Sequence, residues 1–301
     1  MLLYNLRFGW WNVALSPSAP QAKSKANATT YPIICTHIET LLQDNSCDFL
    51  ALCEVSSEDI RYFSENIKLE HISILNLTDK IGKTRFDLAV IYKTSKIKVN
   101  HINSLSKILT DNTVKASQLV EVENIDDSRK IYIYLCHWPS RLNGNSEEKR
   151  IAAANIVYNS ASTLIESGKD VMIMGDFNDN PYDISLYKCL KASRCHDAVK
   201  KYPSEYFYNP FWRSIVSENK YSHSGITNTY RSGSYKYKQF MGEIWHSYDQ
   251  IIVSGSFINN TYWHLNEFRT QVITPEVILK NYEDNSHFID HLPIVCEITR
   301  V

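Results

Sequence analysis

The sequence predicts a mixed α/β protein in which two β-sheets pack face to face. Along the 301 residues, short apolar runs of strand length alternate with polar loops and with a few segments of helical spacing. Two of the runs are separated by a long helical segment, which is the arrangement of parallel strands joined by a crossover helix. No Gly/Ser/Pro-rich linker, charge block or repeat divides the chain, so we expect one domain over residues 1–301.

The composition excludes several classes of protein. The 32 Lys and Arg residues nearly balance the 33 Asp and Glu residues, so the net charge indicates neither a nucleic-acid nor a membrane partner. The N-terminus lacks the basic start and long apolar core of a signal peptide, and no apolar run reaches the length of a membrane span. None of the seven cysteines belongs to a Cys-x-x-Cys pair. We therefore expect a cytoplasmic protein without a membrane segment, a disulfide frame or a zinc site.

The first half of the chain alternates between predicted strands and helices. A strand over residues 2–13 ends near Asn12, and a strand over 48–55 closes on Glu54. A buried carboxylate is costly unless a cation or hydrogen-bond donors receive it, so Glu54 is either paired or a metal ligand. The other predicted elements of this half are a helix over 31–42, a helix over 57–67 capped by Ser57, and strands near 71–77, 85–93, 97–105 and 116–123.

Polar residues also follow two later strands that a helix connects. The strand over 130–137 ends at His137, and Arg141 comes shortly after it. Arginine is suited to bidentate contact with phosphate, whereas a lone histidine is more often structural than catalytic. The helix over 145–167 returns the chain to a strand that starts at Val171.

The stretch from Val171 to Pro181 carries the strongest local signal. An apolar run and Gly175 precede Asp176 and Asn178. A carboxylate two residues before an amide can hold a water molecule and orient it toward an electrophile. Asp, Asn and Pro also favour an ordinary Asx-type turn, which is the commoner explanation for such a stretch taken alone.

The segment from residue 201 to 248 interleaves tyrosine with lysine and arginine. Aromatic rings can stack on bases while the cations meet phosphates, as in the binding of single-stranded nucleic acid. Aromatic loops that merely cover the end of a sheet would explain the same composition. On the nucleic-acid interpretation, Arg141, Tyr230 and Trp245 are candidate substrate contacts.

Candidate functional residues lie beside apolar strands throughout the chain, and the strand ends of two packed sheets can converge on one rim. Their motifs, in chain order, are Asn12, Glu54, His137-Trp-Pro-Ser, Gly175-Asp176-Phe-Asn178, Tyr248-Asp249-Gln-Ile-Ile and Asp290-His291-Leu-Pro. Together these motifs resemble the endonuclease/exonuclease/phosphatase family, typified by pancreatic deoxyribonuclease I and the exonuclease III-type abasic-site endonucleases. The resemblance covers nearly the whole chain. It implies the family's four-layered α/β sandwich, with two mixed β-sheets packed face to face and helices on the outside.

The resemblance also implies a hydrated metal centre. Glu54 and Asp290 resemble ligands of Mg²⁺ or Mn²⁺, and Asn12 resembles the amide that helps to arrange the metal. Asp176 resembles the residue that orients and deprotonates the attacking water. Asn178 resembles a donor to a phosphoryl oxygen. The implied chemistry is in-line hydrolysis of a phosphoester.

Two histidines complete the implied centre. His291 resembles the imidazolium that stabilises charge on the phosphate, oriented by Asp249. His137 resembles the second histidine of the deoxyribonuclease branch, which pairs with an acid, and the nearby candidate for that acid is Asp87. The abasic-site branch has a tyrosine near this position, so His137 speaks against a repair enzyme of that type.

The substrate stays open at the level of the sequence. The same centre serves deoxyribonucleases, deadenylases, inositol polyphosphate phosphatases and sphingomyelinases. The aromatic and basic segment and Arg141 favour a monomeric nuclease, an endonuclease acting on DNA or RNA. One alternative is an intracellular phosphatase or phosphodiesterase acting on a small phosphoester such as an inositol phosphate or a nucleotide. Another is a catalytically silent binding module, against which the intact acidic and histidine positions argue.

Overall fold

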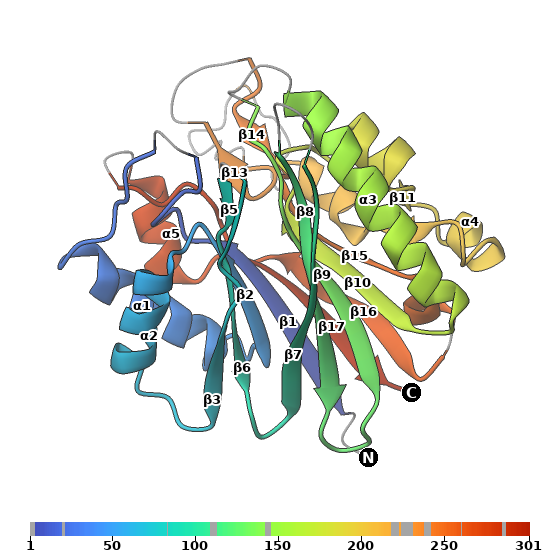
Figure 1. Cartoon of the computed structure of the whole chain (residues 1–301), viewed down its shortest axis with the longest axis horizontal. Coiled ribbons are helices and arrows are strands. Elements are labelled where there is room, and N and C mark those ends of the chain that lie inside the picture. Colours follow the sequence, from blue (N-terminus) through green and yellow to red (C-terminus); the bar gives the residue numbers. More distant parts are fainter. Residues whose placement is uncertain are drawn as a thin grey trace.

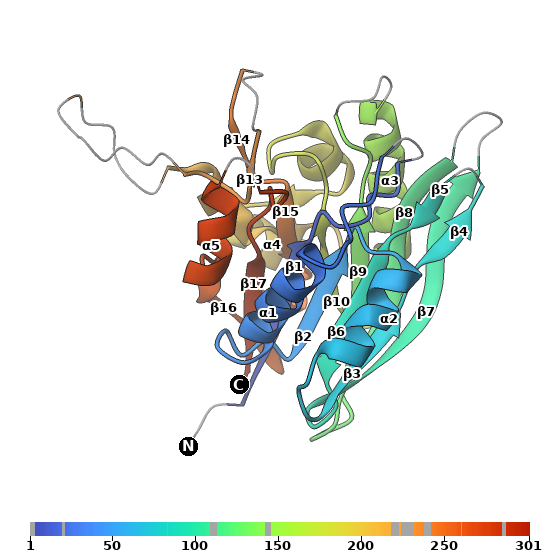
Figure 2. The ribbon, with the colours of Figure 1, turned by 90° about the vertical axis from the view of Figure 1, so that its left-hand side faces the viewer.

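The structure is a computed structural model that describes residues 4–19, 22–82, 84–108, 113–141, 146–217, 223, 231–237, 242–259, 261–284 and 287–301. Two large sheets stand back to back, and helices lie on their outer faces (Figure 1, Figure 2). The four-layered sandwich that the motifs imply is therefore confirmed.

The first sheet is six-stranded and mixed. Its order is β16 (Trp263–Val272), β17 (Ile294–Arg300), β1 (Asn5–Asn12), β2 (Phe49–Cys53), β6 (Leu88–Lys93) and β3 (Ile72–Asn76). β1 and β2 run parallel with α1 (Thr30–Leu42) between them in the chain, and the other neighbouring pairs are antiparallel. The parallel register pairs Asn12 with Cys53, so β1 and β2 end side by side.

The second sheet is seven-stranded and also mixed. Its order is β11 (Ala192–Ser193), β12 (Phe207–Tyr208), β15 (Asp249–Val253), β10 (Asp170–Asp176), β9 (Lys130–His137), β8 (Thr113–Asn124) and β7 (Ile97–Ile108). The predicted crossover unit is confirmed, because β9 and β10 are parallel neighbours joined by α3 (Ser146–Glu166). The register pairs Asp176 with His137 on one side and with Asp249 on the other.

The remaining elements are short. They comprise the hairpins β4 (Asp79–Ile81)/β5 (Thr84–Phe86) and β13 (Tyr235–Lys236)/β14 (Trp245–His246), the helices α2 (Ser57–Asn66), α4 (His196–Lys201) and α5 (Glu276–Glu283), a π-helix over Ser185–Cys189, and 3₁₀ turns over Pro210–Ile215 and Gly255–Ile258. Within the described part of the chain, none of the helices combines the length and apolarity that a membrane crossing needs.

Three apolar layers join the four structural layers. Side chains alternate along β1, so Phe8 and Trp10 face the second sheet whereas Trp11 packs beneath α1 and α5. The outer face of the second sheet receives the alanine-rich side of α3, whose small side chains allow a close approach. The residues of α3 in this layer are Ala153, Ala154, Val157 and Ala161.

The structure corrects two local expectations. Ser56, not Ser57, caps α2, because its side chain accepts from the Asp59 backbone N at 3.2 Å while the Asp59 carboxylate accepts from the Ser56 backbone N at 2.7 Å. This capping box satisfies two backbone donors at once, which a cap at Ser57 would not. The strand predicted over 85–93 is interrupted at Asp87, which lies between β5 and β6.

A histidine lies on the buried face of α1. His37 is 3% exposed, and its ring centre is 5.8 Å from that of Trp11. Asn281 Nδ2 on α5 lies 2.8 Å from His37 Nε2. Burial lowers the pKa of His37 to about 4, and nearby His287 acts in the same direction. The folded protein therefore holds this imidazole neutral.

Acid is expected to destabilise the protein through His37. The pKa in the unfolded chain is about 6.5, so between that pH and about 4 the unfolded state binds a proton that the folded state excludes. The unfolding free energy then falls with falling pH, by about 3 kcal/mol across the window. Urea titrations at neutral pH and near pH 4.5 should show that His37→Gln, which keeps an acceptor for Asn281, loses about 2 kcal/mol less than the unaltered chain. Equal losses would contradict this prediction.

Candidate active site

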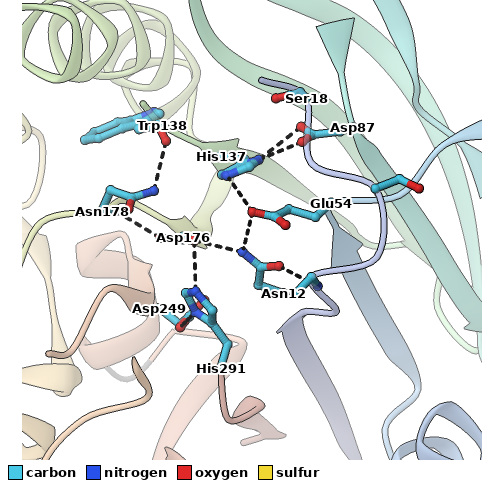
Figure 3. Close-up of polar contacts among 12 residues, drawn as sticks. Asn12, Ser18, Glu54, Asp87, His137, Trp138, Asp176, Asn178, Asp249 and His291 are labelled. Atoms are coloured by element: carbon cyan, nitrogen blue, oxygen red, sulfur yellow. Dashed lines mark hydrogen bonds and ion pairs between the residues drawn. The ribbon is translucent and has the colours of Figure 1, made fainter. Parts of the chain in front are cut away.

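The carboxyl ends of two parallel strand pairs meet at one edge of the packed sheets. β1 ends at Asn12, and Glu54 follows β2 directly. β9 and β10 end at His137 and Asp176. Parallel neighbours end at the same edge of a sheet, and the two sheets pack face to face, so side chains from both point into one space (Figure 3).

Asp176 lies at the centre of this space and is 1% exposed. Its Oδ2 accepts from Asn12 Nδ2 at 3.0 Å, and its Oδ1 accepts from the Asn178 backbone N at 3.0 Å. His291 Nε2 lies 3.7 Å from Oδ2. Burial raises the pKa of the Asp176 carboxyl, although the His291 imidazolium acts against this. A carboxylate with a raised pKa, fixed by two donors, is suited to take a proton from water.

Asn178 lies in the turn after β10. Its backbone φ is +52°, in the left-handed region that asparagine adopts more readily than most residues. Its Nδ2 donates to the Trp138 carbonyl at 3.0 Å. The bond from Asn178 N to Asp176 Oδ1 is an Asx-type turn. The turn interpretation and the functional interpretation of the sequence therefore describe the same residues, because the turn fixes the carboxylate in the site.

His291 is oriented by a buried acid. Its Nδ1 lies 2.7 Å from Asp249 Oδ2, which leaves Nε2 facing Asp176. Asp249 also accepts from Trp10 Nε1 at 2.9 Å and from Ser234 Oγ at 2.6 Å. Burial disfavours the imidazolium, but Asp249 and Asp176 outweigh it and raise the pKa of His291 to about 10. At neutral pH the ring is therefore charged and has an N–H directed into the site.

His137 is oriented by a second acid. Its Nδ1 lies 3.0 Å from both carboxylate oxygens of Asp87, which is also 3.3 Å from Lys115 Nζ. Burial opposes the charged ring, but Asp87 outweighs it and raises the pKa of His137. Burial likewise opposes the charged carboxylate, yet His137 and Lys115 hold the pKa of Asp87 well below its usual range. Both shifts favour the charged pair, an imidazolium beside a carboxylate. His137 Nε2 lies 3.9 Å from Glu54 Oε1.

Glu54 and Asp290 fit a hard divalent cation. Glu54 has a φ of +58°, an unusual conformation of the kind that concentrates at functional sites. Burial raises the pKa of Glu54, and repulsion from Asp290 and Asp87 adds to the effect while His137 opposes it. The buried Oδ1 of Asp290 has no hydrogen-bond partner among the residues that the structure describes. A cation bound by carboxylate oxygens would offset the repulsion and supply the missing partner.

Two other groups of side chains bring ligand-type atoms within 4.8 Å of one another. They are Cys53, His137 and Asp176, and Asp176, Asp249 and His291. Burial raises the pKa of the Cys53 thiol well above its usual value, which opposes the thiolate form that a metal ligand needs. Both imidazoles face buried acids through Nδ1, which favours their charged forms, and a charged ring offers no lone pair to a metal. The carboxylate oxygens of Glu54 and Asp290 therefore suit a hard cation better than the thiol and imidazole atoms of these two groups.

The three predicted substrate contacts differ in their surroundings. Arg141 pairs with the carboxylates of Asp179 and Asp183, so its charge is already matched in this structure. Trp245 is half-buried on β14. Tyr230 lies outside the described residues.

Aromatic rings border the site beside His291. The Tyr235 ring lies 4.6 Å from the His291 ring and is stacked at 5.3 Å on Tyr248. The His246 ring also stacks on the Tyr248 ring, with the two ring centres 4.6 Å apart. Tyr237 meets Tyr235 edge-on at 4.9 Å. Part of the tyrosine-rich segment therefore lies against the catalytic candidates.

Comparison with known proteins relates the whole chain to one family. A sequence model of the "Endonuclease/Exonuclease/phosphatase family" matches residues 18–288. No curated protein matches the chain.

Solved structures with the same fold include enzymes of different specificity. The human Nocturnin catalytic domain with bound sulfate is 16% identical, with a TM-score of 0.58 over 99% of this chain and 95% of that one. D. rerio TDP2 in complex with a single-strand DNA product is 13% identical, with a TM-score of 0.59 and 98% coverage of both chains. A mannosyl-6-phosphatase of Bacteroides thetaiotaomicron is 15% identical, with a TM-score of 0.56 over 97% of this chain and 99% of that one. At these identities the likeness shows the fold alone.

Proposed function

The chain belongs to the endonuclease/exonuclease/phosphatase family, and on that premise we propose that it is a divalent-metal-dependent phosphodiesterase that hydrolyses nucleic acid. Members of the family are phosphoester hydrolases, and this chain is a hydrolase of that class. The observation that carries the proposal is the position of Asp176, which lies within reach of Asn12 and His291 at one strand edge.

Asp176 acts as the base in the proposed reaction. Its carboxylate holds the attacking water and takes a proton from it, while Asn12 and the Asn178 backbone keep the two oxygens in place. The Asn178 side chain donates one N–H to the Trp138 carbonyl, and its second N–H is the donor for a phosphoryl oxygen. Orientation of the water by fixed groups lowers the entropic part of the barrier.

The two histidines act on the phosphate and on the leaving oxygen. His291, held by Asp249, directs an N–H toward the space beside Asp176 and stabilises charge on the phosphoryl oxygens. His137, held by Asp87, lies on the Glu54 side and donates a proton or a hydrogen bond to the leaving oxygen.

A divalent cation is part of the proposal. Glu54, Asp290 and Asn12 would hold Mg²⁺ or Mn²⁺, hard ions that prefer oxygen ligands. When bound, such an ion would offset the negative charge that develops on the phosphate in the transition state. Asp290 Oδ1 has no partner within the described part of the chain, which supports a ligand at this point.

Nucleic acid is preferred over a small phosphoester because of the aromatic border. Tyr235 lies next to His291 and is partly exposed, so its ring could stack on a base beside the scissile phosphate, while buried Tyr248 supports it from behind. The solved structure of TDP2 with single-strand DNA product supports this choice by analogy of fold. The mannosyl-6-phosphatase of the same fold favours the alternative, an enzyme acting on a small phosphoester such as an inositol phosphate or a nucleotide.

Cleavage assays distinguish the two substrates. End-labelled single- and double-stranded DNA and RNA would be incubated with Mg²⁺, Mn²⁺ or chelator, beside an Asp176→Ala control. We expect metal-dependent fragments of internal length that are absent from the control. Phosphate release from inositol phosphates or nucleotides, with every polymer intact, would replace the nuclease proposal by the alternative.

A further inference from the structure

A pocket lies near the catalytic candidates, on the His137 side. Its volume is about 670 Å³. Its lining includes the side chains of Ser18, Ser57, Thr78, Lys80, Thr84 and Arg85. The pocket is close to the candidate active site because two of its lining residues are near site residues in the sequence. Ser56 follows Glu54 by two residues, and Arg85 precedes Asp87 by two. Two residues span at most about 7 Å. The β4/β5 hairpin, which carries Lys80, Thr84 and Arg85, lies next to β8 (Figure 2).

Two cations face each other in this pocket. Lys80 on β4 is directly opposite Arg85 on β5 in the antiparallel register, so the two side chains lie on the same face of the hairpin. Like charges at such a position are destabilising unless an anion lies between them. Asp79 also borders the pocket, but successive side chains on a strand point to opposite faces.

Neither cation forms a direct ion pair among the described residues, although the charge of Arg85 acts on buried Asp87. Arg85 donates to the backbone carbonyls of Val55 at 2.7 Å and Ser16 at 2.6 Å. Among the described residues, no carboxylate lies within ion-pair distance of either Lys80 or Arg85. The Lys80 side chain is exposed and forms no hydrogen bond within the same set of residues.

Hydroxyl groups surround the two cations. Ser57 Oγ and Thr78 Oγ1 lie 2.6 Å apart, and Thr84 is half-buried on the hairpin. Ser18 Oγ accepts a hydrogen bond from Lys115 Nζ at 2.8 Å, and Lys115 Nζ also donates to the Asp87 carboxylate. Serine and threonine hydroxyls can donate to phosphate oxygens, and lysine and arginine provide the charge.

We propose that this pocket binds a second phosphate group of the substrate, next to the phosphate that is cleaved. The proposal rests on the proposed phosphoesterase function and narrows its substrate to a molecule with at least two phosphates at neighbouring positions. That chemistry belongs equally to a polynucleotide and to a small bisphosphorylated ester. In both, Lys80 and Arg85 hold the group that is not cleaved.

A pair of substrates with the same scissile bond tests the proposal. Thymidine 5′-(p-nitrophenyl phosphate) carries one phosphate, and its 3′-phosphorylated form carries two. We expect the second phosphate to raise kcat/KM about tenfold, the strength of one charge-assisted contact. Lys80→Glu should remove this advantage and leave hydrolysis of the singly phosphorylated ester unchanged. Inositol 4-phosphate and inositol 4,5-bisphosphate, whose two phosphates are on adjacent carbons, form the matching small-ester pair. The pair of substrates that shows the advantage identifies its source.

Lys98→Glu is the matched control. Lys98 is also an exposed lysine in a paired strand, but it lies at the start of β7, away from the site. It should retain the full advantage of the second phosphate. An advantage that survives Lys80→Glu, or an equal loss on both esters, would overturn the proposal.

Direct binding separates this inference from the proposed function. Thymidine 3′,5′-bisphosphate would be titrated calorimetrically into the unaltered chain and into both variants. Binding about tenfold weaker in Lys80→Glu alone supports the pocket even if no ester is hydrolysed. Equal binding by all three proteins would reject the pocket even if the enzyme is an active nuclease.

Discussion

Replacement of Asp176 by asparagine is expected to lower kcat/KM about a thousandfold, because the variant keeps the shape of the side chain but loses the base. Asn12 Nδ2 and the Asn178 backbone N both donate to the Asp176 carboxylate. The NH₂ group of the new amide would face one of these donors, so one hydrogen bond would be lost. Against that lost hydrogen bond, the substitution removes a buried charge whose pKa burial raises. We therefore expect an unfolding free energy within about 1 kcal/mol of the unaltered chain.

Asp170→Asn provides a control on the same strand. Asp170 begins β10 at the end opposite Asp176, and burial raises the pKa of its carboxyl as well. Its replacement should leave kcat/KM unchanged. Steady-state kinetics on the substrate that is turned over, together with urea unfolding of both variants, measure the two effects. An Asp176→Asn enzyme with more than a tenth of the original kcat/KM would show that Asp176 is not the base.

The sequence predicts the polar strand ends because each is a local pattern. An apolar run followed by Glu54, His137 or Asp176 is visible without knowledge of the fold. These residues form one site because two pairs of strands are parallel and in register. The strands of each pair therefore end side by side at the same edge of their sheet. The crossover between β9 and β10 could be predicted from its helix, and it is confirmed. The order of motifs along the chain then indicates the family.

The supporting contacts could not be predicted in the same way. Trp10 Nε1 reaches Asp249 across 239 positions of sequence, and its apolar run contains no sign of that bond. Lys115 and Ser234 similarly serve carboxylates that lie in other elements. These contacts exist only because the sheets pack face to face, so they require the three-dimensional structure.

The two histidines have equivalent supports on either side of the reacting space. Each ring is fixed through Nδ1 by a buried acid, and each acid has a further donor, Lys115 for Asp87 and Trp10 for Asp249. The acids favour the charged form of each ring, since the pKa of both histidines is raised, and they leave Nε2 as the outward-facing group. A phosphate bound between them would be approached by cationic N–H groups from both sheets.

Gly175→Ala is expected to destabilise the fold and the site together. A Cβ on Gly175 would lie 2.1 Å from the carbonyl oxygen of Cys136 on the parallel neighbour β9. Real Cβ contacts are essentially never below 3.0 Å, so β9 and β10 would have to separate by about 1 Å. These strands carry His137 and Asp176 at the next paired position. We expect a loss of about 3 kcal/mol in unfolding free energy and about a hundredfold loss in kcat/KM.

Gly9→Ala separates this close approach from a general cost of filling space in a strand. Gly9 lies inside β1, and its added Cβ would meet the Cys47 Sγ and Leu50 Cδ1 atoms at 3.0 Å. These are side-chain atoms that can move by a few tenths of an ångström, so a loss of about 1 kcal/mol and nearly full activity are expected. Urea unfolding and kcat/KM measured on both variants test the difference. If both alanine variants lose the same unfolding free energy and the same kcat/KM, the spacing of β9 and β10 does not set the geometry of the site. The parallel pairing of these strands is then not what places His137 beside Asp176.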